Sequence, residues 1–129
     1  MPNMKIITRS FTRAKHALYG ICYATKHDYS YRHQFYLGAL ALIIIGYLLA
    51  PLTGHELLFL VLAWALILIT ELQNSAFESV LDHLHPESHE AIGRGKDMAA
   101  GAVLIAGLFL VLVIGVLFCS RITQGFVLF

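Results

Sequence analysis

Charged residues, cysteine and proline are scarce in this 129-residue sequence. Only 13% of its residues are charged, 58% are hydrophobic and the mean hydropathy is +0.72, a composition that excludes an ordinary small soluble domain and indicates a membrane domain. Cys22 and Cys119 have neither a C-x-x-C partner nor metal-ligand spacing, so no thiolate metal site is expected. Internal repeats, low-complexity tracts and a Walker A motif are absent, and we expect no cleavable signal peptide.

Three apolar segments are long enough to be membrane spans, for which about 20 residues are needed. Residues 35–52 and 98–119 carry no charge, and residues 57–82 form a run without proline or glycine. The connection between the first two segments is very short, which predicts an antiparallel hairpin. The polar stretch 83–97 contains Pro86 and two glycines and is expected to be a loop. We therefore predict an all-α integral membrane protein with one domain over residues 1–129 and spans at 33–52, 56–82 and 97–120.

The N-terminal segment, about residues 6–26, has the periodicity of an amphipathic helix. Apolar residues recur at helical spacing on one side, and cationic and aromatic residues project from the other: Ile7, Phe11, Ala14, Leu18 and Ile21 against Arg9, Arg13, His16, Tyr19 and Tyr23. This pattern is typical of a helix that lies in the membrane interface. A helix against a soluble core would show it too, but hardly any soluble core is left to receive it.

Topology follows from the distribution of Lys and Arg. Six of the nine precede residue 33, Arg94 and Lys96 lie in the second connection, and the first connection has none. The positive-inside rule then places the N-terminus and the second connection in the cytoplasm.

One stripe of polar residues continues the second apolar segment. At about 100° per residue its members fall within roughly 80° of arc, and we call this set the carboxylate stripe: Glu71, Asn74, Glu78 and Asp82. Ionisable groups at membrane depth cost free energy, so their presence indicates a function. The alternative interpretation of the stripe is a polar helix end that frays into solvent.

The stripe has the residue types of a phosphoryl-transfer site. Carboxylate and amide oxygens suit Mg²⁺, Arg and Lys suit a polyphosphate, and a further carboxylate can serve as the general base on an attacking hydroxyl. A small oligomeric protein that binds or conducts divalent cations is an alternative, because carboxylate rings occur in such pores. It would not explain Arg94, Lys96 or the cationic first helix. A passive scaffold would leave the intramembrane charges without a purpose.

The same residues also resemble a known family. Residues 71–82 read E-L-Q-N-S-A-F-E-S-V-L-D and residues 93–104 read G-R-G-K-D-M-A-A-G-A-V-L. The pattern E-x-x-N-x-x-x-E-x-x-x-D, followed 14 residues later by K-D, resembles the signature of the prokaryotic diacylglycerol kinase and undecaprenol kinase family. The order of an amphipathic helix and three spans is similar too, and the likeness covers about residues 9–117.

This resemblance implies a kinase that phosphorylates diacylglycerol or undecaprenol with ATP and Mg²⁺, and it leaves the choice of lipid open. It implies a homotrimer with composite active sites on the cytoplasmic side of a bacterial inner membrane, with no nucleic-acid partner. Glu71 would be the general base, and Glu78 and Asp28 the metal ligands, although Asp28 replaces a glutamate of the family. The implied nucleotide contacts are Arg9, His16, Asp28, Glu78, Glu87, Ser88, His89, Lys96 and Asp97, and the implied supporting residues are Arg9, Asn74, Ser75, Asp82 and Ala100.

The remaining polar and aromatic residues are expected to have structural or solvated roles. His83, His85 and His89 suggest a transition-metal cluster, but Pro86 interrupts their alignment and we expect them to be solvated, with His89 a nucleotide contact by resemblance. His55 and Glu56 are expected to be solvated at the outer turn. Trp64 is expected to pack or to contact lipid.

Overall fold

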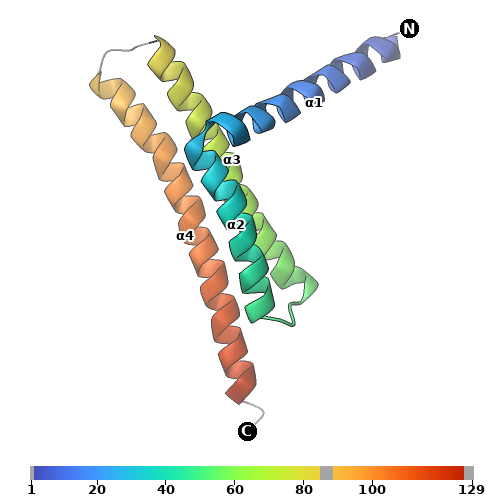
Figure 1. Cartoon of the computed structure of the whole chain (residues 1–129), viewed down its shortest axis with the longest axis vertical. Helices are drawn as coiled ribbons and strands as arrows, with labels where there is room; N and C mark the ends of the chain where they lie inside the picture. The colour runs from blue at the N-terminus through green and yellow to red at the C-terminus, as the bar shows by residue number, and fades with distance from the viewer. Residues whose placement is uncertain (1, 85–88, 127–129) are drawn as a thin grey trace.

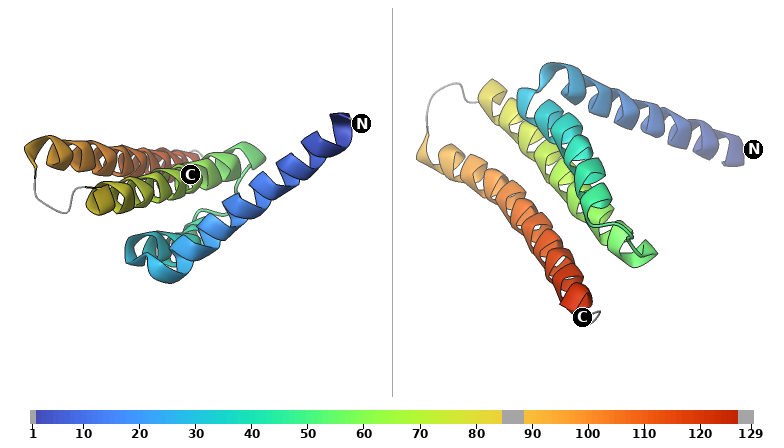
Figure 2. Two further views of the ribbon diagram at one scale, coloured as in Figure 1. Left: turned by 90° about the horizontal axis from the view of Figure 1, so that it is seen from above. Right: turned by 60° about the horizontal axis from the view of Figure 1, so that its bottom comes forward.

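The computed structural model describes residues 2–84 and 89–126, and the backbone of these ranges forms four α-helices without a strand (Figure 1). They are α1 (Pro2–His27), α2 (Tyr29–Leu48), α3 (Gly54–Leu84) and α4 (Glu90–Phe126). α3 and α4 run along the length of the molecule with α2 beside them, and α1 leaves the top of α2 and points away (Figures 1 and 2). The predicted all-α class is confirmed.

Short polar caps set the helix boundaries. Asp28 separates α1 from α2 and caps α2, because its extended backbone lets Oδ1 accept a hydrogen bond from the Tyr31 amide at 2.8 Å. Thr53 and Glu56 form a capping box at the start of α3, with the Thr53 amide donating to the Glu56 carboxylate at 2.7 Å and the Glu56 amide donating to the Thr53 hydroxyl at 3.3 Å. From this capping box α3 continues through the carboxylate stripe to Leu84 without a break, as predicted.

The connection between α3 and α4 is shorter than the predicted loop of residues 83–97. α3 reaches Leu84 and α4 already begins at Glu90, so Gly93 and Gly95 lie inside a helix. His89 caps this helix by accepting from the Ala91 amide, and Glu90 pairs with Arg94 one turn later at 2.5 Å. An acidic residue in the first turn and an i,i+4 ion pair both favour helix, which offsets the cost of the two glycines.

Apolar packing between the helices is concentrated in the lower half of the bundle. Leu60 and Ala63 of α3 meet Val113 and Leu117 of α4, and Leu49 closes this cluster from the end of α2. Higher up, the Trp64 indole of α3 donates a hydrogen bond to the Gln34 carbonyl of α2 at 3.1 Å, and its ring centroid lies 5.9 Å from that of Phe35. Gly38 permits this approach, because a Cβ atom there would lie 2.4 Å from Trp64 Nε1. Trp64 therefore packs, as expected, and also fixes α2 on α3.

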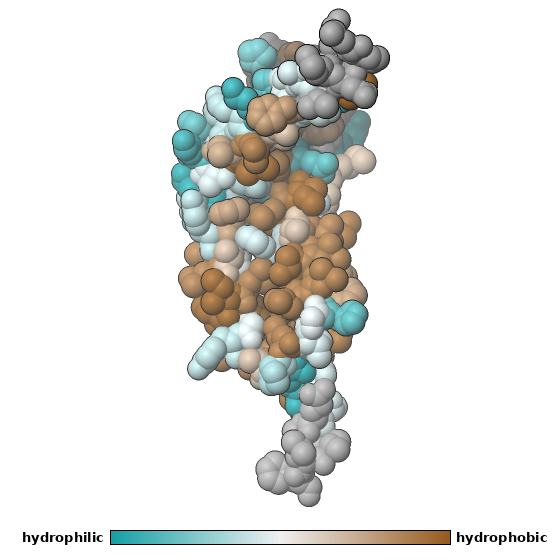
Figure 3. Space-filling view, turned by 90° about the vertical axis from the view of Figure 1, so that its right-hand side faces the viewer, coloured by the Kyte–Doolittle hydropathy of each residue, from teal (hydrophilic) through white to brown (hydrophobic). Residues whose placement is uncertain are grey.

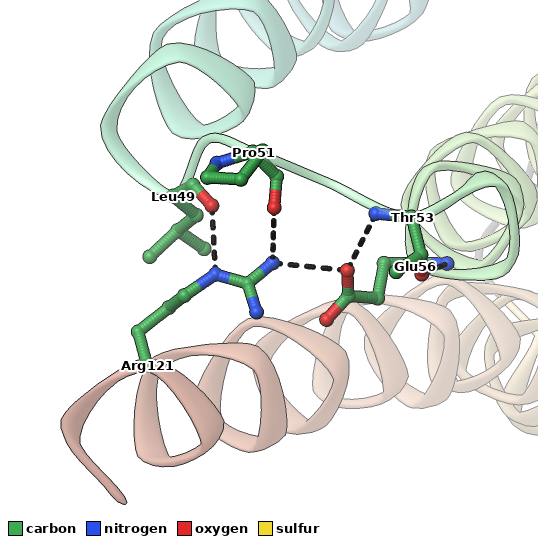
Figure 4. Close-up of polar contacts among 5 residues, drawn as sticks. All are labelled: Leu49, Pro51, Thr53, Glu56 and Arg121. Carbon is green, nitrogen blue, oxygen red and sulfur yellow. Dashed lines mark hydrogen bonds and ion pairs between the residues drawn. The ribbon is translucent and has the colours of Figure 1, made fainter. Parts of the chain in front are cut away.

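A polar clasp closes the other end of the bundle, away from the carboxylate stripe (Figure 4). Arg121 of α4 donates to the Leu49 and Pro51 carbonyls, both at 2.8 Å, and to the Glu56 carboxylate at 2.9 Å. The expectation that Glu56 is merely solvated is therefore wrong: its side chain is only 19% exposed and is held by Arg121 and by its own cap. His55 is exposed, as expected.

Much of the surface is apolar, as in a chain that faces lipid. Six aliphatic residues of α4 are each at least 60% exposed: Leu104, Ile105, Leu108, Val111, Leu112 and Val116. Figure 3 shows a broad hydrophobic surface over the middle of the molecule, with hydrophilic residues mainly at its ends. So large an apolar surface marks contact with lipid or with other subunits.

By length and composition, two helices can cross a membrane, α3 over Gly54–Leu84 and α4 over Glu90–Thr123. α2 is not among them, because polar residues occupy its first turns and the apolar part of this helix, residues 35–48, is short. The sequence placed the end of this span at residue 52, whereas the helix ends at Leu48 and the chain then turns toward Pro51.

The contact between Gly38 and Trp64 predicts that Gly38→Ala destabilises the protein by about 1–3 kcal/mol, because the added methyl group displaces the indole and its hydrogen bond. Unfolding by SDS in mixed micelles, followed by Trp64 fluorescence, measures this loss. Gly46→Ala is the matched control in the same helix, since the nearest atom to its new methyl group would be Leu52 Cδ1 at an ordinary 3.8 Å. Equal losses in the two variants would contradict the close approach.

Candidate active site

Glu71 lies at the helix interface because it continues the buried face of α3. The buried residues of this helix are spaced by three or four, namely Leu60, Ala63, Ile67 and Glu71, and Glu71 is only 4% exposed. It is the one buried charged residue in the described part of the chain, and no side chain or backbone amide there donates to its carboxylate. A buried carboxylate without a partner is costly, so this group is poised to receive a hydrogen bond from a ligand.

Asn74 and Glu78 lie one and two turns further along the same stripe. Asn74 Nδ2 donates to Glu78 Oε1 at 3.2 Å, which fixes the amide so that Oδ1 is turned inward. That oxygen is buried and has no hydrogen-bond partner among the described residues. Oxygen atoms of this kind are the ligands that Mg²⁺ prefers. The Glu78 carboxylate and the Asn74 amide oxygen can therefore still act as ligands of a cation that keeps some of its water.

Asp82 ends the stripe and links it to α4. Its carboxylate forms an ion pair with Lys96 across the two helices, and the two side chains are 65% and 31% exposed. An exposed pair of this kind contributes about 0–1 kcal/mol of stability, so Lys96 can exchange Asp82 for another anion at little cost. Asp97 and Ala100 follow on α4 and are exposed.

Two grooves flank the stripe on α3. One, of about 560 Å³, lies between α3 and α4 and is lined by Asn74, Phe77 and Met98. Three small residues also line it: Gly95, Ala99 and Ala102. The other, of about 640 Å³, separates the last turns of α1 from α3 and is lined by Asp28, Ser75 and Ser79, together with Tyr23 and His27. Both are large enough for part of a lipid or a nucleotide.

Asp28 faces the second groove with one carboxylate oxygen already used. Oδ1 caps α2, so only the other oxygen is available to a ligand. Next to this cap, Tyr31 is buried, with 4% of its surface exposed. In the described part of the chain, no three His, Cys, Asp or Glu side chains converge to hold a metal ion. A magnesium ion would therefore keep waters or phosphate oxygens in its coordination shell.

The other predicted contacts lie outside this centre. Arg9 and His16 are exposed on α1 and line neither of the two grooves, so one chain does not bring them to the stripe. Glu87 and Ser88 lie outside the described residues. His89 is exposed at the first turn of α4, about two turns before Lys96. The sequence reasoning did not point to His27 and Ser79; only their spacing from Asp28 and Ser75 along the helices could have suggested them.

The fold and the site together define a class of protein. A helical membrane protein that presents carboxylate and amide oxygens beside a lysine at one end of its bundle carries the groups that phosphoryl transfer at a membrane surface requires. The model of the prokaryotic diacylglycerol kinase family matches residues 15–118, and the chain belongs to this family.

Relatives agree with this assignment. A protein of Haemophilus influenzae named diacylglycerol kinase is 33% identical over 100 residues, which are 78% of this chain and 83% of that protein. The Escherichia coli K12 protein of the same name is 33% identical over 99 residues, 77% of this chain and 80% of its own length. A Synechocystis protein, also named diacylglycerol kinase, is 36% identical over 104 residues, 80% of this chain and 58% of that protein. The chain is therefore a membrane lipid kinase.

Glu71→Gln tests the role of the buried carboxylate. Glutamine has the same shape and, unlike glutamate, carries no charge to desolvate, so the fold should persist while lipid phosphorylation falls by about 10²–10⁴-fold if the carboxylate is the base. The rate of lipid phosphorylation measures this, with circular dichroism as a check on folding. Glu90→Gln removes an exposed carboxylate outside the stripe and is the control, expected to leave the rate unchanged. A rate in Glu71→Gln within tenfold of the unaltered protein would remove this role.

Proposed function

We propose that this kinase transfers the γ-phosphate of ATP to the hydroxyl of a membrane lipid at the cytoplasmic face of a bacterial inner membrane. The observation that carries the proposal is the unpartnered carboxylate of Glu71, buried in a membrane helix next to Asn74 and Glu78. The relatives are named for diacylglycerol, which we take as the first candidate acceptor. Undecaprenol is the second, since the resemblance noted from the sequence covers kinases of both lipids.

In the proposed topology, α2, α3 and α4 cross the membrane and α1 lies on its cytoplasmic surface. Over its 20 residues α2 is about 30 Å long, which matches the thickness of the hydrocarbon core, and the apolar residues that follow it as far as Leu52 lengthen its apolar part. The cations of α1 and of the start of α4 then share the cytoplasmic side. Arg121 lies on the opposite side, where Glu56 neutralises it. The exposed apolar face of α1, with Phe11 and Leu18, would rest on the bilayer.

The proposed chemistry assigns one task to each part of the site. Glu71 takes the proton of the acceptor hydroxyl, which makes that oxygen a stronger nucleophile toward the γ-phosphorus. Lys96 leaves Asp82 for the phosphates and stabilises the negative charge on the transferred group. Glu78, Asn74 and the free oxygen of Asp28 would hold Mg²⁺. When bound, the ion would neutralise phosphate charge and orient the phosphates for in-line attack.

We further propose that the site is completed by a neighbouring subunit in a homotrimer. Arg9 and His16 are exposed on a helix that projects from its own bundle, which leaves them free to cover the nucleotide of another subunit. The large exposed apolar area of α2, α3 and α4 leaves room for such subunit contacts. A composite site would also bring a second phosphate-binding cation, Arg9, to join Lys96.

Because Asp28 both caps α2 and faces the groove, two substitutions separate these tasks. Asp28→Asn keeps the cap, since asparagine caps as well as aspartate, but removes the charge, so we expect normal stability and a raised magnesium requirement. Asp28→Glu keeps the charge and is expected to weaken the cap by up to about 1 kcal/mol. Rates against magnesium concentration, together with SDS unfolding, measure both effects. An unchanged magnesium requirement in Asp28→Asn would exclude it as a ligand.

The proposed reaction is tested by transfer of labelled phosphate from ATP in mixed micelles, with diacylglycerol and undecaprenol offered separately and in competition, each with and without Mg²⁺. We expect product from at least one lipid, only with Mg²⁺. A cation-binding or cation-conducting protein would give none. Product without Mg²⁺ would contradict the metal assignment, and a preference in competition decides between the two acceptors.

A further inference from the structure

We propose that one face of α2 binds the phosphate headgroup of an anionic phospholipid, at a place separate from the kinase site. This Arg32 face consists of Tyr29, Arg32 and His33 at the start of α2 with Tyr36, Leu40, Ile43 and Tyr47 below them. The inference rests on the proposed membrane position of α2 and does not depend on the chemistry of the kinase site.

Arg32 is a cation that is held in place but not neutralised. Its Nη1 donates to the Lys26 carbonyl at 3.2 Å, and its guanidinium carbon lies 5.8 Å from the centroid of the Tyr29 ring. No carboxylate of the described residues pairs with it, because Asp28, one turn earlier, caps α2. The guanidinium is thus half-buried and pre-oriented, and its remaining N–H groups suit the oxygens of a phosphate.

His33 and Lys26 add to the same cationic end. His33 Nδ1 lies 3.0 Å from the Tyr29 carbonyl, and its ring centroid lies 3.9 Å from that of Tyr29. Because a carbonyl oxygen only accepts, Nδ1 carries a proton, and Nε2 donates to a phosphate only when both ring nitrogens are protonated. Lys26 is exposed in the last turn of α1 and has no ion pair among the described residues. Three nitrogen-bearing side chains therefore gather where α1 meets α2.

The surface below Arg32 is suited to acyl chains. At about 100° per residue, Arg32, Tyr36, Leu40, Ile43 and Tyr47 lie within roughly 80° of one another around α2. The four residues below Arg32 are each more than half exposed. The opposite side of α2 is the one that Trp64 contacts at Gln34 and Gly38, so the Arg32 face points away from α3. A cationic group above an exposed apolar strip matches a phospholipid, with its phosphate at the interface and its chains along the helix.

The Arg32 face is distinct from the grooves beside the carboxylate stripe. Asp28 and His27 line the groove against α3, whereas Tyr29, Arg32 and His33 line neither of the two grooves. An anionic lipid at this face would hold the junction of α1 and α2 at the membrane surface. We commit to a membrane phospholipid as the occupant because the apolar strip continues directly from the cation.

Trp64 contacts the opposite side of α2, so Leu40→Trp supplies the fluorescent reporter on the Arg32 face; it is the parent of every variant below, and the Trp64 signal is its background. The full-length protein is reconstituted in phosphatidylcholine vesicles that contain either brominated phosphatidylglycerol or brominated phosphatidylcholine, and quenching gives the relative affinity for the two headgroups. For a site with at least one pre-oriented cation we expect phosphatidylglycerol to be preferred by about fivefold or more. Arg32→Gln should reduce this ratio to near one.

Arg13→Gln is the matched control, since it removes one exposed cation of α1 that is not part of the Arg32 face and should leave the ratio unchanged. Arg32→Lys keeps the charge without the planar fork and should give an intermediate ratio, which serves if Arg32→Gln does not fold. Equal quenching by the two lipids in the Leu40→Trp parent would overturn the headgroup site while leaving α2 in the membrane. Absence of quenching by both would also remove the membrane position of α2. Competition of ATP with phosphatidylglycerol, or an equal loss in Arg13→Gln, would likewise refute a specific lipid site.

Discussion

The carboxylate of Glu71 is buried among helices, and no described group of the chain pairs with it. Such a group is tolerated only where the surrounding packing is strong enough to keep the helix face in place. Leu60, Ala63 and Ile67 provide that packing on the same face of α3, and α4 covers it with Val113 and Leu117. The position of Glu71 is thus a consequence of an apolar interface two to three turns away from it.

The two ends of the α3 and α4 pair are closed by ion pairs of different character. At the outer end, Arg121 is held by Glu56 and by two backbone carbonyls, and both side chains are mostly buried. At the inner end, Lys96 meets only Asp82, and this pair is largely exposed. Because an exposed pair contributes little, the end that holds Asp82 and Lys96 can rearrange while the end that holds Arg121 keeps the helices in register. The more constrained pair lies far from the site, and the looser one lies within it.

The junction of α1 and α2 combines several tasks in a few residues. Asp28 ends α1, caps α2 and presents its second oxygen to the groove against α3. Arg32, one turn later, faces away from that groove and closes the junction through the Lys26 carbonyl. α1 and α2 meet here at an angle that these local hydrogen bonds fix. The direction of α1 relative to α2 therefore depends on this single turn.

Local pattern determined the helices and the candidate residues of this protein. The uninterrupted apolar run into Glu71 fixed α3, and the spacing of Glu71, Asn74 and Glu78 fixed their common face, because helical periodicity is a local property. Contacts between distant segments were decided only by the tertiary structure. Arg121 reaches Leu49 across 72 residues and Trp64 reaches Gln34 across 30, and no local signal marks either partner. The start of α4 at Glu90 depended on a cap and an ion pair, which together outweigh the cost of two glycines in the helix. The double role of Asp28, as the cap of α2 and as a lining residue of the groove, required the packing of α1 on α2 and α3.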